Sequence, residues 1–269
     1  MILLRQITDR LVLQPTRYPV YSFGKSPRQL PFRKGALEIW TRRWGCETSD
    51  EAAVFVLKFT GTGGRAERAT IAPLDYWDDV RAEFWAVNPP GYGGSSGRAS
   101  LKYLAEAGAA AYDELRRIAG DRPIIVSGNS LGTVTALHLA ATRDVAGLIL
   151  RNPPPLRQMI LGRHGWWNLW LGAALIAAHV PDSLCSVRNA GRCTAPAIFV
   201  TSARDRVVPP FYQLRILRAY AGKKRVLVLD DADHDTRLTP VEQQRFEQLV
   251  GWLRARTGLS VPAVRELCV

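Results

Sequence analysis

The chain has 269 residues, of which 47% are hydrophobic, and this size and composition fit one globular domain with a substantial core. The formal net charge is +12, but the basic residues are scattered and no zinc-finger, RNP or basic-helix pattern accompanies them, so the charge does not indicate a nucleic-acid partner. The first apolar stretch ends at Arg5, too soon for a signal-peptide core or a membrane span, so we expect a cytoplasmic protein.

Residues 1–34 combine four prolines with aromatic and basic residues, which predicts an irregular lead-in with at most one short strand near Arg10 to Leu13. Downstream, apolar runs bounded by Gly, Pro or Asn predict strands, and runs with helical periodicity alternate with them. The expected strands cover residues 37–43, 53–59, 82–87, 123–126, 145–150, 197–201 and 225–229, and the expected helices cover 100–118, 133–143, 211–221 and 240–256. Continuously apolar strands are typical of strands buried on both faces. The sequence therefore predicts a single α/β domain over 1–269 with a mostly parallel, doubly wound sheet.

Residues 153–193 interrupt this alternation. The segment opens on three prolines and continues into an apolar stretch that is shorter than the roughly 20 residues needed to cross a bilayer. We interpret it as a helical insertion. Its three tryptophans are expected to pack the insertion onto the body, and weak peripheral contact with an anionic membrane is the minor alternative.

The four cysteines show no C-x-x-C spacing and no histidine arranged with them for a metal site. We expect free thiols at Cys46, Cys185, Cys193 and Cys268. A bridge between Cys185 and Cys193 around a short loop is the alternative.

A five-residue motif, Gly128-Asn129-Ser130-Leu131-Gly132, lies between an expected strand and an expected helix. A serine hydroxyl is a weak nucleophile, so it must be held where a base can take its proton. A sharp turn from strand to helix presents the serine in this way, and glycines two residues before and after it let strand and helix pass closely. The setting favours Ser130 as a nucleophile over a Gly/Ser turn without a chemical role.

One histidine is placed to act as the base. His138 lies eight positions along the helix from Ser130, and His164 and His179 belong to the insertion. That leaves His234, in the polar loop after the last expected strand, where its ring could reach across the top of the sheet.

An acidic residue is needed to orient this histidine. Asp205 stands just past the C-terminal end of the expected strand 197–201, where ligand sites of parallel α/β sheets lie. The acids next to the histidine are alternatives for the same role, namely Asp230, Asp231 and Asp233.

These residues carry a resemblance. The motif around Ser130, then Asp205 followed by Val-Val-Pro, and then His234 occur in the order Ser, Asp, His that α/β-hydrolases show. Over about residues 35–256, the chain resembles an α/β-hydrolase of the serine esterase or lipase kind with a short cap. The resemblance implies the α/β-hydrolase fold, Ser130 as nucleophile, His234 as general base and then acid, and Asp205 as the residue that orients His234. It implies no metal and no organic cofactor.

The same resemblance implies an oxyanion hole built from two backbone N–H groups. Leu131, directly after the serine, supplies one of them. The other is assigned to Thr62, in the glycine-rich segment that follows the expected strand 53–59. Thr60 stands where histidine is common in this family, a departure that leaves the backbone donor in place.

By position, residues 153–193 match the cap that covers the active site in this family. The segment contains one acid, Asp182, against four arginines, which disfavours a peptide amine and fits an apolar acyl chain with a neutral or anionic head. The candidate substrate contacts are Tyr92, Trp166, Trp167 and Trp170.

The sequence thus predicts a serine hydrolase that cleaves a carboxylic ester of a small apolar acyl substrate through an acyl-enzyme. An acyl thioesterase, in which cap arginines meet an anionic carrier, and a serine peptidase would use the same residues. The alternative from another class is a non-catalytic, hydrolase-like protein that binds an apolar ligand. No oligomeric state follows from the sequence.

Overall fold

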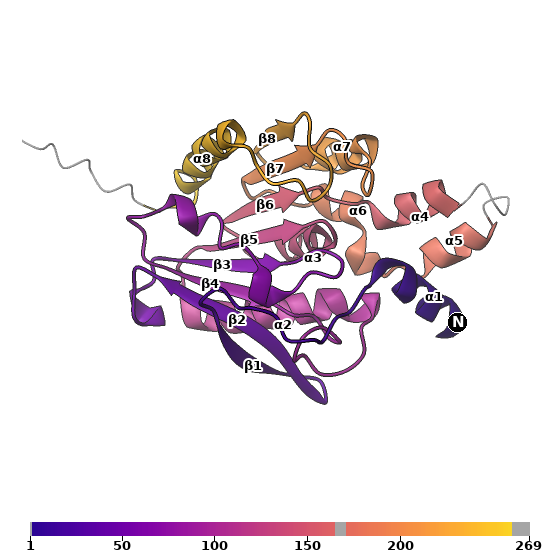
Figure 1. The fold of residues 1–269 in the computed structure, drawn as a ribbon, viewed down its shortest axis with the longest axis horizontal. Helices are drawn as coiled ribbons and strands as arrows, with labels where there is room; N and C mark the ends of the chain where they lie inside the picture. Colours follow the sequence, from indigo (N-terminus) through magenta and orange to yellow (C-terminus); the bar gives the residue numbers. More distant parts are fainter. Residues whose placement is uncertain (1, 165–170, 260–269) are drawn as a thin grey trace, which may run out of the picture.

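The computed structural model describes residues 2–164 and 171–259. Its centre is an eight-stranded sheet in the order β1-β2-β4-β3-β5-β6-β7-β8 (Figure 1). The strands are β1 (Ser26–Phe32), β2 (Gly35–Trp44), β3 (Val54–Phe59), β4 (Ala82–Val87), β5 (Ile124–Asn129), β6 (Gly147–Arg151), β7 (Ala197–Ser202) and β8 (Lys224–Leu229). From β4 to β8 every pair is parallel, and only β1 and β2 run antiparallel to their neighbours. The predicted mostly parallel sheet is confirmed.

The helices are α1 (Ile2–Val12), α2 (Leu101–Ala119), α3 (Leu131–Ala140), α4 (Leu156–His164), α5 (Leu171–Ala178), α6 (Ser186–Ala190), α7 (Pro210–Ala219) and α8 (Pro240–Arg254). Helices cover both faces of the sheet, whereas α1, α4 and α5 pack together beyond the carboxyl ends of the strands (Figure 1). Two of the helices begin at a side-chain cap: Ser100 accepts from the N–H of Lys102 before α2, and Thr239 forms a capping box with Glu242 at α8.

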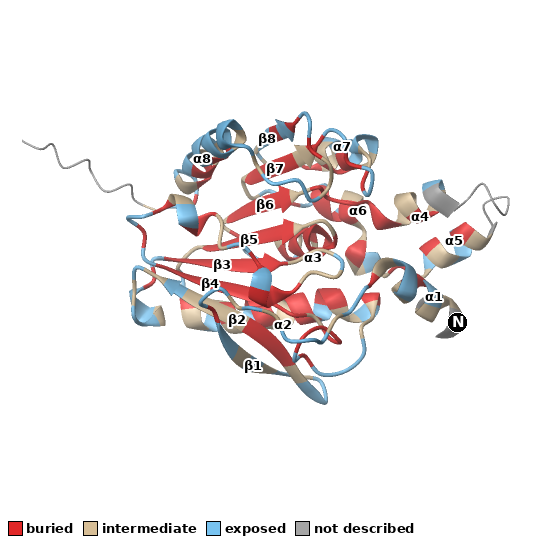
Figure 2. Ribbon diagram, in the orientation of Figure 1, coloured by how far each residue is buried: buried red, intermediate tan, exposed pale blue. Residues whose placement is uncertain are grey.

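The sheet separates two apolar cores, because successive side chains of a strand point to opposite faces. In β5, Val126 packs with α2 and α3, whereas its neighbour Ile125 packs in the core that includes α8. All residues of β3 and β4 are buried (Figure 2). Burial on both faces explains the continuous apolar runs of the sequence.

The N-terminal region differs from the predicted irregular lead-in. Residues 2–12 form α1 instead of a strand near Arg10 to Leu13, and residues 26–32 form β1 at the edge of the sheet. The helix is held by tertiary contacts: the Thr8 hydroxyl contacts the carbonyl oxygen of Ile176 in α5 at 3.2 Å. Pro27 and Pro31 obscured β1 in the sequence, because proline is compatible with a strand only at an edge or a bulge.

The insertion between β6 and β7 is helical in its described parts, which are α4, α5 and the short α6. Trp166, Trp167 and Trp170 lie outside the described residues, so the structure does not place these candidate contacts. None of the helices in residues 2–164 and 171–259 has the length and apolar character to cross a membrane.

The cysteines that the structure describes are not bridged. Cys46, Cys185 and Cys193 are free thiols, so the alternative of a bridge between Cys185 and Cys193 is excluded. Burial raises the pKa of the Cys193 thiol to about 12, so it stays protonated and packs as a small apolar side chain. Cys268 lies outside the described residues.

Candidate active site

Ser130 occupies the turn between β5 and α3, at the carboxyl ends of the parallel strands. Its backbone has φ +48° and ψ −120°, a region that side-chain-bearing residues rarely adopt. Two bonds hold this conformation: the Ser130 N–H donates to the carbonyl of Arg151 at 2.8 Å, and its own carbonyl accepts from the Thr133 N–H at 2.9 Å. The strain turns the side chain out of the sheet toward the open end of the strands.

The two glycines of the motif are required by close backbone approach. A Cβ on Gly132 would lie 2.2 Å from the carbonyl oxygen of Phe59, and a Cβ on Gly128 would lie 2.6 Å from the nitrogen of Thr133. Both contacts are with backbone atoms, which cannot rotate away. The strand-to-helix turn therefore exists in this form only with glycine at both positions.

We expect Gly132→Ala to lower the free energy of unfolding by about 3 kcal/mol or more, because the new methyl group forces the backbone of β3 away from α3. Urea unfolding followed by circular dichroism measures this loss. Gly251→Ala in α8 is the matched control, since its Cβ would meet no atom within 4 Å. The control should gain about 0.5–1 kcal/mol from helix propensity, and equal effects of the two substitutions would contradict the steric argument.

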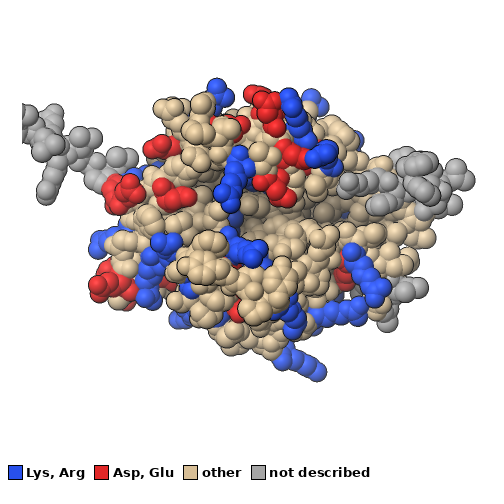
Figure 3. Space-filling model, in the orientation of Figure 1, with Lys and Arg blue, Asp and Glu red and all other residues tan. Residues whose placement is uncertain are grey.

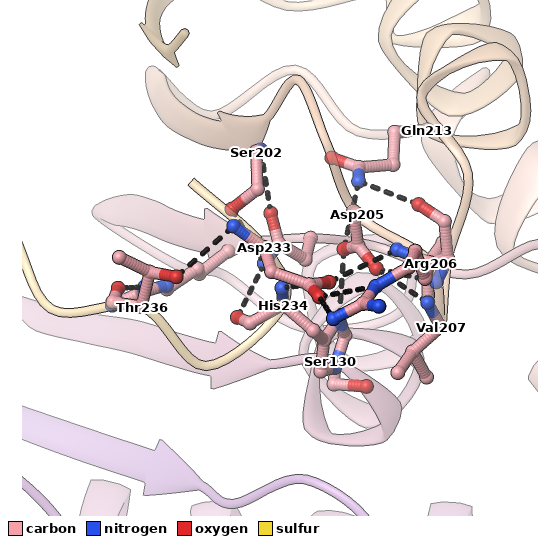
Figure 4. A network of polar contacts seen from close by, with 12 residues as sticks. Ser130, Ser202, Asp205, Arg206, Val207, Gln213, Asp233, His234 and Thr236 are labelled. Atoms are coloured by element: carbon pink, nitrogen blue, oxygen red, sulfur yellow. Dashed lines mark hydrogen bonds and ion pairs between the residues drawn. The ribbon is translucent and has the colours of Figure 1, made fainter. Parts of the chain in front are cut away.

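Asp205 and His234 meet above the end of β7. The Nδ1 atom of His234 lies 2.7 Å from Oδ2 of Asp205, and the carboxylate is fully buried while the histidine side chain is 11% exposed (Figure 4). A buried carboxylate in this position fixes the ring with its other nitrogen, Nε2, turned away from the acid. This is the pairing that orients a general base.

The Asp205 carboxylate is held from its other side as well. Its Oδ1 accepts from the N–H groups of Val207 at 2.8 Å and Val208 at 2.7 Å. Its Oδ2 also accepts from Nε2 of Gln213 in α7 at 3.1 Å, and the same amide nitrogen donates to the Val208 carbonyl. The sequence analysis did not predict a role for Gln213, because a glutamine in a helix eight residues after Asp205 gives no sign of this contact.

Asn152, directly after β6, positions the loop that carries His234. Its Nδ2 donates to the backbone carbonyl of His234 at 2.9 Å, and its Oδ1 accepts from the Ser202 N–H at 2.9 Å. Asn152 has φ +49°, a conformation that asparagine tolerates better than most residues. This residue was also not predicted from the sequence.

Of the acids next to the histidine, Asp233 has a different role. Its Oδ1 accepts from the N–H groups of Arg206 and His234, and its Oδ2 is bonded by the Arg206 guanidinium. Hydrogen bonds from these backbone N–H groups and from Arg206 lower the pKa of Asp233 to about 2. Asp231 pairs with Arg204 at 2.5 Å. The structure thus brings Asp205, not these acids, to the imidazole.

The other described histidines lie elsewhere. His138 is on α3 facing the insertion, and burial lowers its pKa. His179 contacts the carbonyl of Leu175 within its own helical segment at 2.7 Å. His164 belongs to α4, and its side chain is outside the described set.

A cleft of about 630 Å³ opens at the carboxyl ends of the strands and contains both Ser130 and His234. Figure 4 shows Ser130 at the start of α3, beneath the histidine. No hydrogen bond to the Ser130 hydroxyl is present within the described residues, a common state for a site without substrate. One wall of the cleft is apolar and comes from α1, the start of α3 and α4, with Leu11, Val12, Leu131, Leu156, Met159 and Ile160.

Two backbone N–H groups remain free beside Ser130. Leu131 and Thr62 both line the cleft, and within the described chain neither donates its N–H to a protein acceptor. Gly61 brings the Thr62 segment against the serine, since a Cβ on Gly61 would lie 3.2 Å from Cβ of Ser130. These are the two donors that the sequence assigned to an oxyanion hole.

Tyr92 is placed differently from the prediction. The ring is 2% exposed, and its hydroxyl accepts from the Gln14 N–H at 3.2 Å, so it anchors the segment after α1 and does not line the cleft with Ser130. Contact between Tyr92 and a substrate therefore stays a prediction. The loop that contains Tyr92 is held by buried polar groups, including Asn88, whose Oδ1 accepts from the Ala66 N–H.

Lys58, near the end of β3, is a buried cation that the sequence analysis did not single out. It is 4% exposed, and its Nζ donates to Ser127 Oγ at 2.9 Å and to Asn129 Oδ1 at 3.1 Å. Burial, reinforced by the positive charge of Arg151, lowers the pKa of Lys58 to about 8. A lysine within a strand could have been noticed, but only the fold shows that it is buried beside the nucleophile.

The lowered pKa of Lys58 predicts that the free energy of unfolding of the protein depends on pH. Between pH 8 and about 10.5 the unfolded chain holds the Lys58 proton more tightly than the folded chain, so wild-type stability rises with pH over this window. Lys58→Met lacks this titration. We expect its free energy of unfolding, relative to wild type, to fall by roughly 3 kcal/mol from pH 8 to pH 10.5. Urea unfolding at several pH values measures the difference, and a constant offset would contradict the assignment.

The comparison with protein families gives a match over residues 62–183 to the family model described as alpha/beta hydrolase fold. An uncharacterized protein of Mycobacterium tuberculosis is 30% identical over 148 residues, which cover 54% of this chain and 50% of that protein. Human alpha/beta hydrolase domain-containing protein 17B is 25% identical over 179 residues, covering 64% and 57%. The chain thus spans 50% and 57% of the length of these two relatives.

Solved structures share the fold at low sequence identity. Est1E from Butyrivibrio proteoclasticus superposes with a TM-score of 0.66 at 15% identity, covering 85% of this chain and 99% of that one. Acylaminoacyl peptidase from Pyrococcus horikoshii gives a TM-score of 0.63 at 17% identity, covering 87% of this chain and 42% of that one. These similarities concern the arrangement of strands and helices.

Proposed function

We propose that this chain, which belongs to the α/β-hydrolase superfamily, is a serine hydrolase that cleaves a carboxylic ester with an apolar acyl chain. The observation that carries the proposal is the bond between His234 and buried Asp205, in a cleft that also contains the strained Ser130. Serine, histidine and aspartate thus come from three separate strand ends to one place. A core built only for stability does not require this convergence.

In the proposed reaction, His234 Nε2 accepts the Ser130 proton while Oγ attacks the ester carbonyl. The carbonyl oxygen becomes an oxyanion, and the N–H groups of Leu131 and Thr62 stabilise it. The imidazolium then gives its proton to the leaving alcohol, which leaves an acyl group on Ser130. Water, activated by His234 as base, attacks this acyl-enzyme and releases the carboxylic acid.

The cleft wall favours an apolar acyl chain. Leu131, Leu156, Met159 and Ile160 line it beside Ser130, and burying apolar substrate surface against them contributes roughly 25 cal/mol per Å². No Asp or Glu side chain other than Asp235 lines the cleft among the described residues, so a cationic amine finds little to bind. This disfavours a peptidase, although a peptidase is among the proteins of similar fold.

An acyl thioester is the second candidate substrate, but the arginines of the insertion do not support it. Arg157 and Arg188 of the insertion both bond Asp182, through its carboxylate and its backbone carbonyl respectively, and neither lines the cleft. They are therefore unsuited to meeting an anionic carrier there. The basic residues that do line the cleft are Lys58, Arg65 and Arg68, on the side of β3.

A substrate panel tests the proposal. Purified protein is offered an acyl ester, the acyl thioester of the same chain length and an amino-acid arylamide, each before and after treatment with a fluorophosphonate. We expect turnover of the ester, weaker turnover of the thioester, and loss of both after treatment. A folded protein that turns over none of the three and takes up no fluorophosphonate would favour the non-catalytic, ligand-binding alternative.

A further inference from the structure

A second cavity, of about 540 Å³, lies next to the active-site cleft on the face of the sheet that carries α8. The two cavities share a wall that includes Lys58, Arg68 and Asn129. Asn129 directly precedes Ser130, so the shared wall reaches the residue next to the nucleophile. The cavity is thus a side chamber of the cleft.

The lining of this chamber is strongly cationic. Six basic side chains surround it, namely Lys25, Arg42, Lys58, Arg68, Arg151 and Arg237, against one carboxylate, Asp75. In the space-filling view, basic side chains gather around a hollow in the middle of this face (Figure 3). Arg68 and Arg237 are exposed, whereas Lys25 and Lys58 are buried, so the positive charge extends from the surface to the floor.

None of these six cations forms an ion pair with a carboxylate in the described parts of the chain. Their recorded polar contacts are with neutral groups, as in the bond from the Arg151 guanidinium to the backbone carbonyl of Thr236. Burial raises the pKa of Asp75, the one carboxyl group in the lining. Elsewhere some arginines on the surface do pair with acids, as Arg117 does with Glu114.

Lys58 is the most deeply buried positive charge in the chamber, and no carboxylate of the described residues forms an ion pair with it. Its ammonium group is buried against two neutral oxygens, which use two of its three donors. A buried charge without a counter-ion is costly unless a partner is supplied. An anion in the chamber would accept the third N–H and neutralise the group.

We propose that this chamber binds the phosphate monoester group of the substrate whose acyl ester is held at Ser130. The assignment of an ester substrate rests on the proposed function. The binding of phosphate in the chamber does not depend on it. Cations converge on the chamber from β2, β3, β6 and three connecting segments, and one negative charge cannot match them all. A phosphate dianion therefore fits the chamber better than a carboxylate does. Arginine and lysine together are the usual ligands of phosphate.

Binding of inorganic phosphate, measured by titration calorimetry, tests the chamber without any need for activity. We expect wild type and Ser130→Ala to bind alike, and Arg68→Gln and Arg237→Gln to bind about tenfold to hundredfold more weakly, as for the loss of a charged hydrogen bond. Arg117→Gln on α2 removes the same charge outside the chamber and should bind as wild type does. Weakening by Arg117→Gln as strong as in the chamber variants, or an absence of binding in wild type, overturns the proposal.

Matched substrates then test the link to the ester. The first pair is a 1-acylglycerol 3-phosphate and the 1-monoacylglycerol of the same chain; the second is the acyl thioester of 4′-phosphopantetheine and that of pantetheine. We expect kcat/KM to be at least tenfold higher for the phosphorylated member of one pair, which identifies a lipid or a carrier as the source, and Arg237→Gln should remove the preference. Phosphate binding with no preference in either pair overturns the substrate assignment. Phosphate binding with no turnover of any ester or thioester means that the proposed hydrolase function has failed while the anion site stands.

Discussion

Ser130→Ala is expected to lose all labelling by a fluorophosphonate and to lower kcat for ester hydrolysis by at least about 10⁴-fold, because no other atom can form the acyl-enzyme. Alanine at position 130 can adopt the same backbone conformation as serine, so the fold should be retained. Intact-protein mass spectrometry after labelling shows whether the adduct forms, and steady-state kinetics give the loss in rate.

Ser127→Ala is the matched control for this experiment. Ser127 lies three residues earlier in β5, and its hydroxyl contacts Lys58 and not the histidine. It should therefore label at the wild-type level. Labelling of Ser130→Ala at the wild-type rate, with the adduct on another residue, would remove Ser130 from the proposed mechanism.

Asp205→Asn is expected to lower kcat/KM by about 10⁴-fold without unfolding the protein. The N–H groups of Val207 and Val208 favour the amide oxygen at the Oδ1 position, which leaves the amide nitrogen facing His234. Nδ1 of the imidazole must then accept a hydrogen bond, so the proton moves to Nε2. In that tautomer the ring cannot take the proton of Ser130. The loss is measured in kcat/KM and in the rate of fluorophosphonate labelling.

Asp233→Asn makes the same change of charge one residue from the histidine. Its carboxylate contacts Arg206 and backbone N–H groups rather than the imidazole, so we expect kcat/KM to stay within about tenfold of wild type. If the two substitutions exchanged their effects, Asp233 would be the residue that orients His234.

The parts of this molecule that could be predicted from its sequence are those fixed by local rules. The glycines at 128 and 132 indicated close backbone approach, and in the structure backbone atoms lie 2.2–2.6 Å from where their Cβ atoms would be. The strands predicted at 82–87 and 197–201 were found at those positions, within a residue, because strands buried on both faces are continuously apolar. The pairing of His234 with Asp205 was implied by the family resemblance, because position after a strand end alone left Asp230, Asp231 and Asp233 as alternatives.

The remainder depended on contacts between distant segments. The helix α1 is stable because it packs on α5, a contact that its own sequence does not reveal. Asn152 and Gln213 are ordinary polar residues until the fold brings them to His234 and Asp205. The chamber beside Lys58 is assembled from side chains far apart in the sequence, which composition had presented only as scattered positive charge.

The prolines in β1 have a consequence for how this molecule meets others of its kind. A sheet grows by accepting another strand at an open edge, where outward-facing N–H and C=O groups await partners. β1 is one of the two edges, and Pro27 and Pro31 each remove a donor from it. A neighbouring copy therefore cannot form a regular ladder along β1, and this border of the sheet is protected from edge-to-edge aggregation.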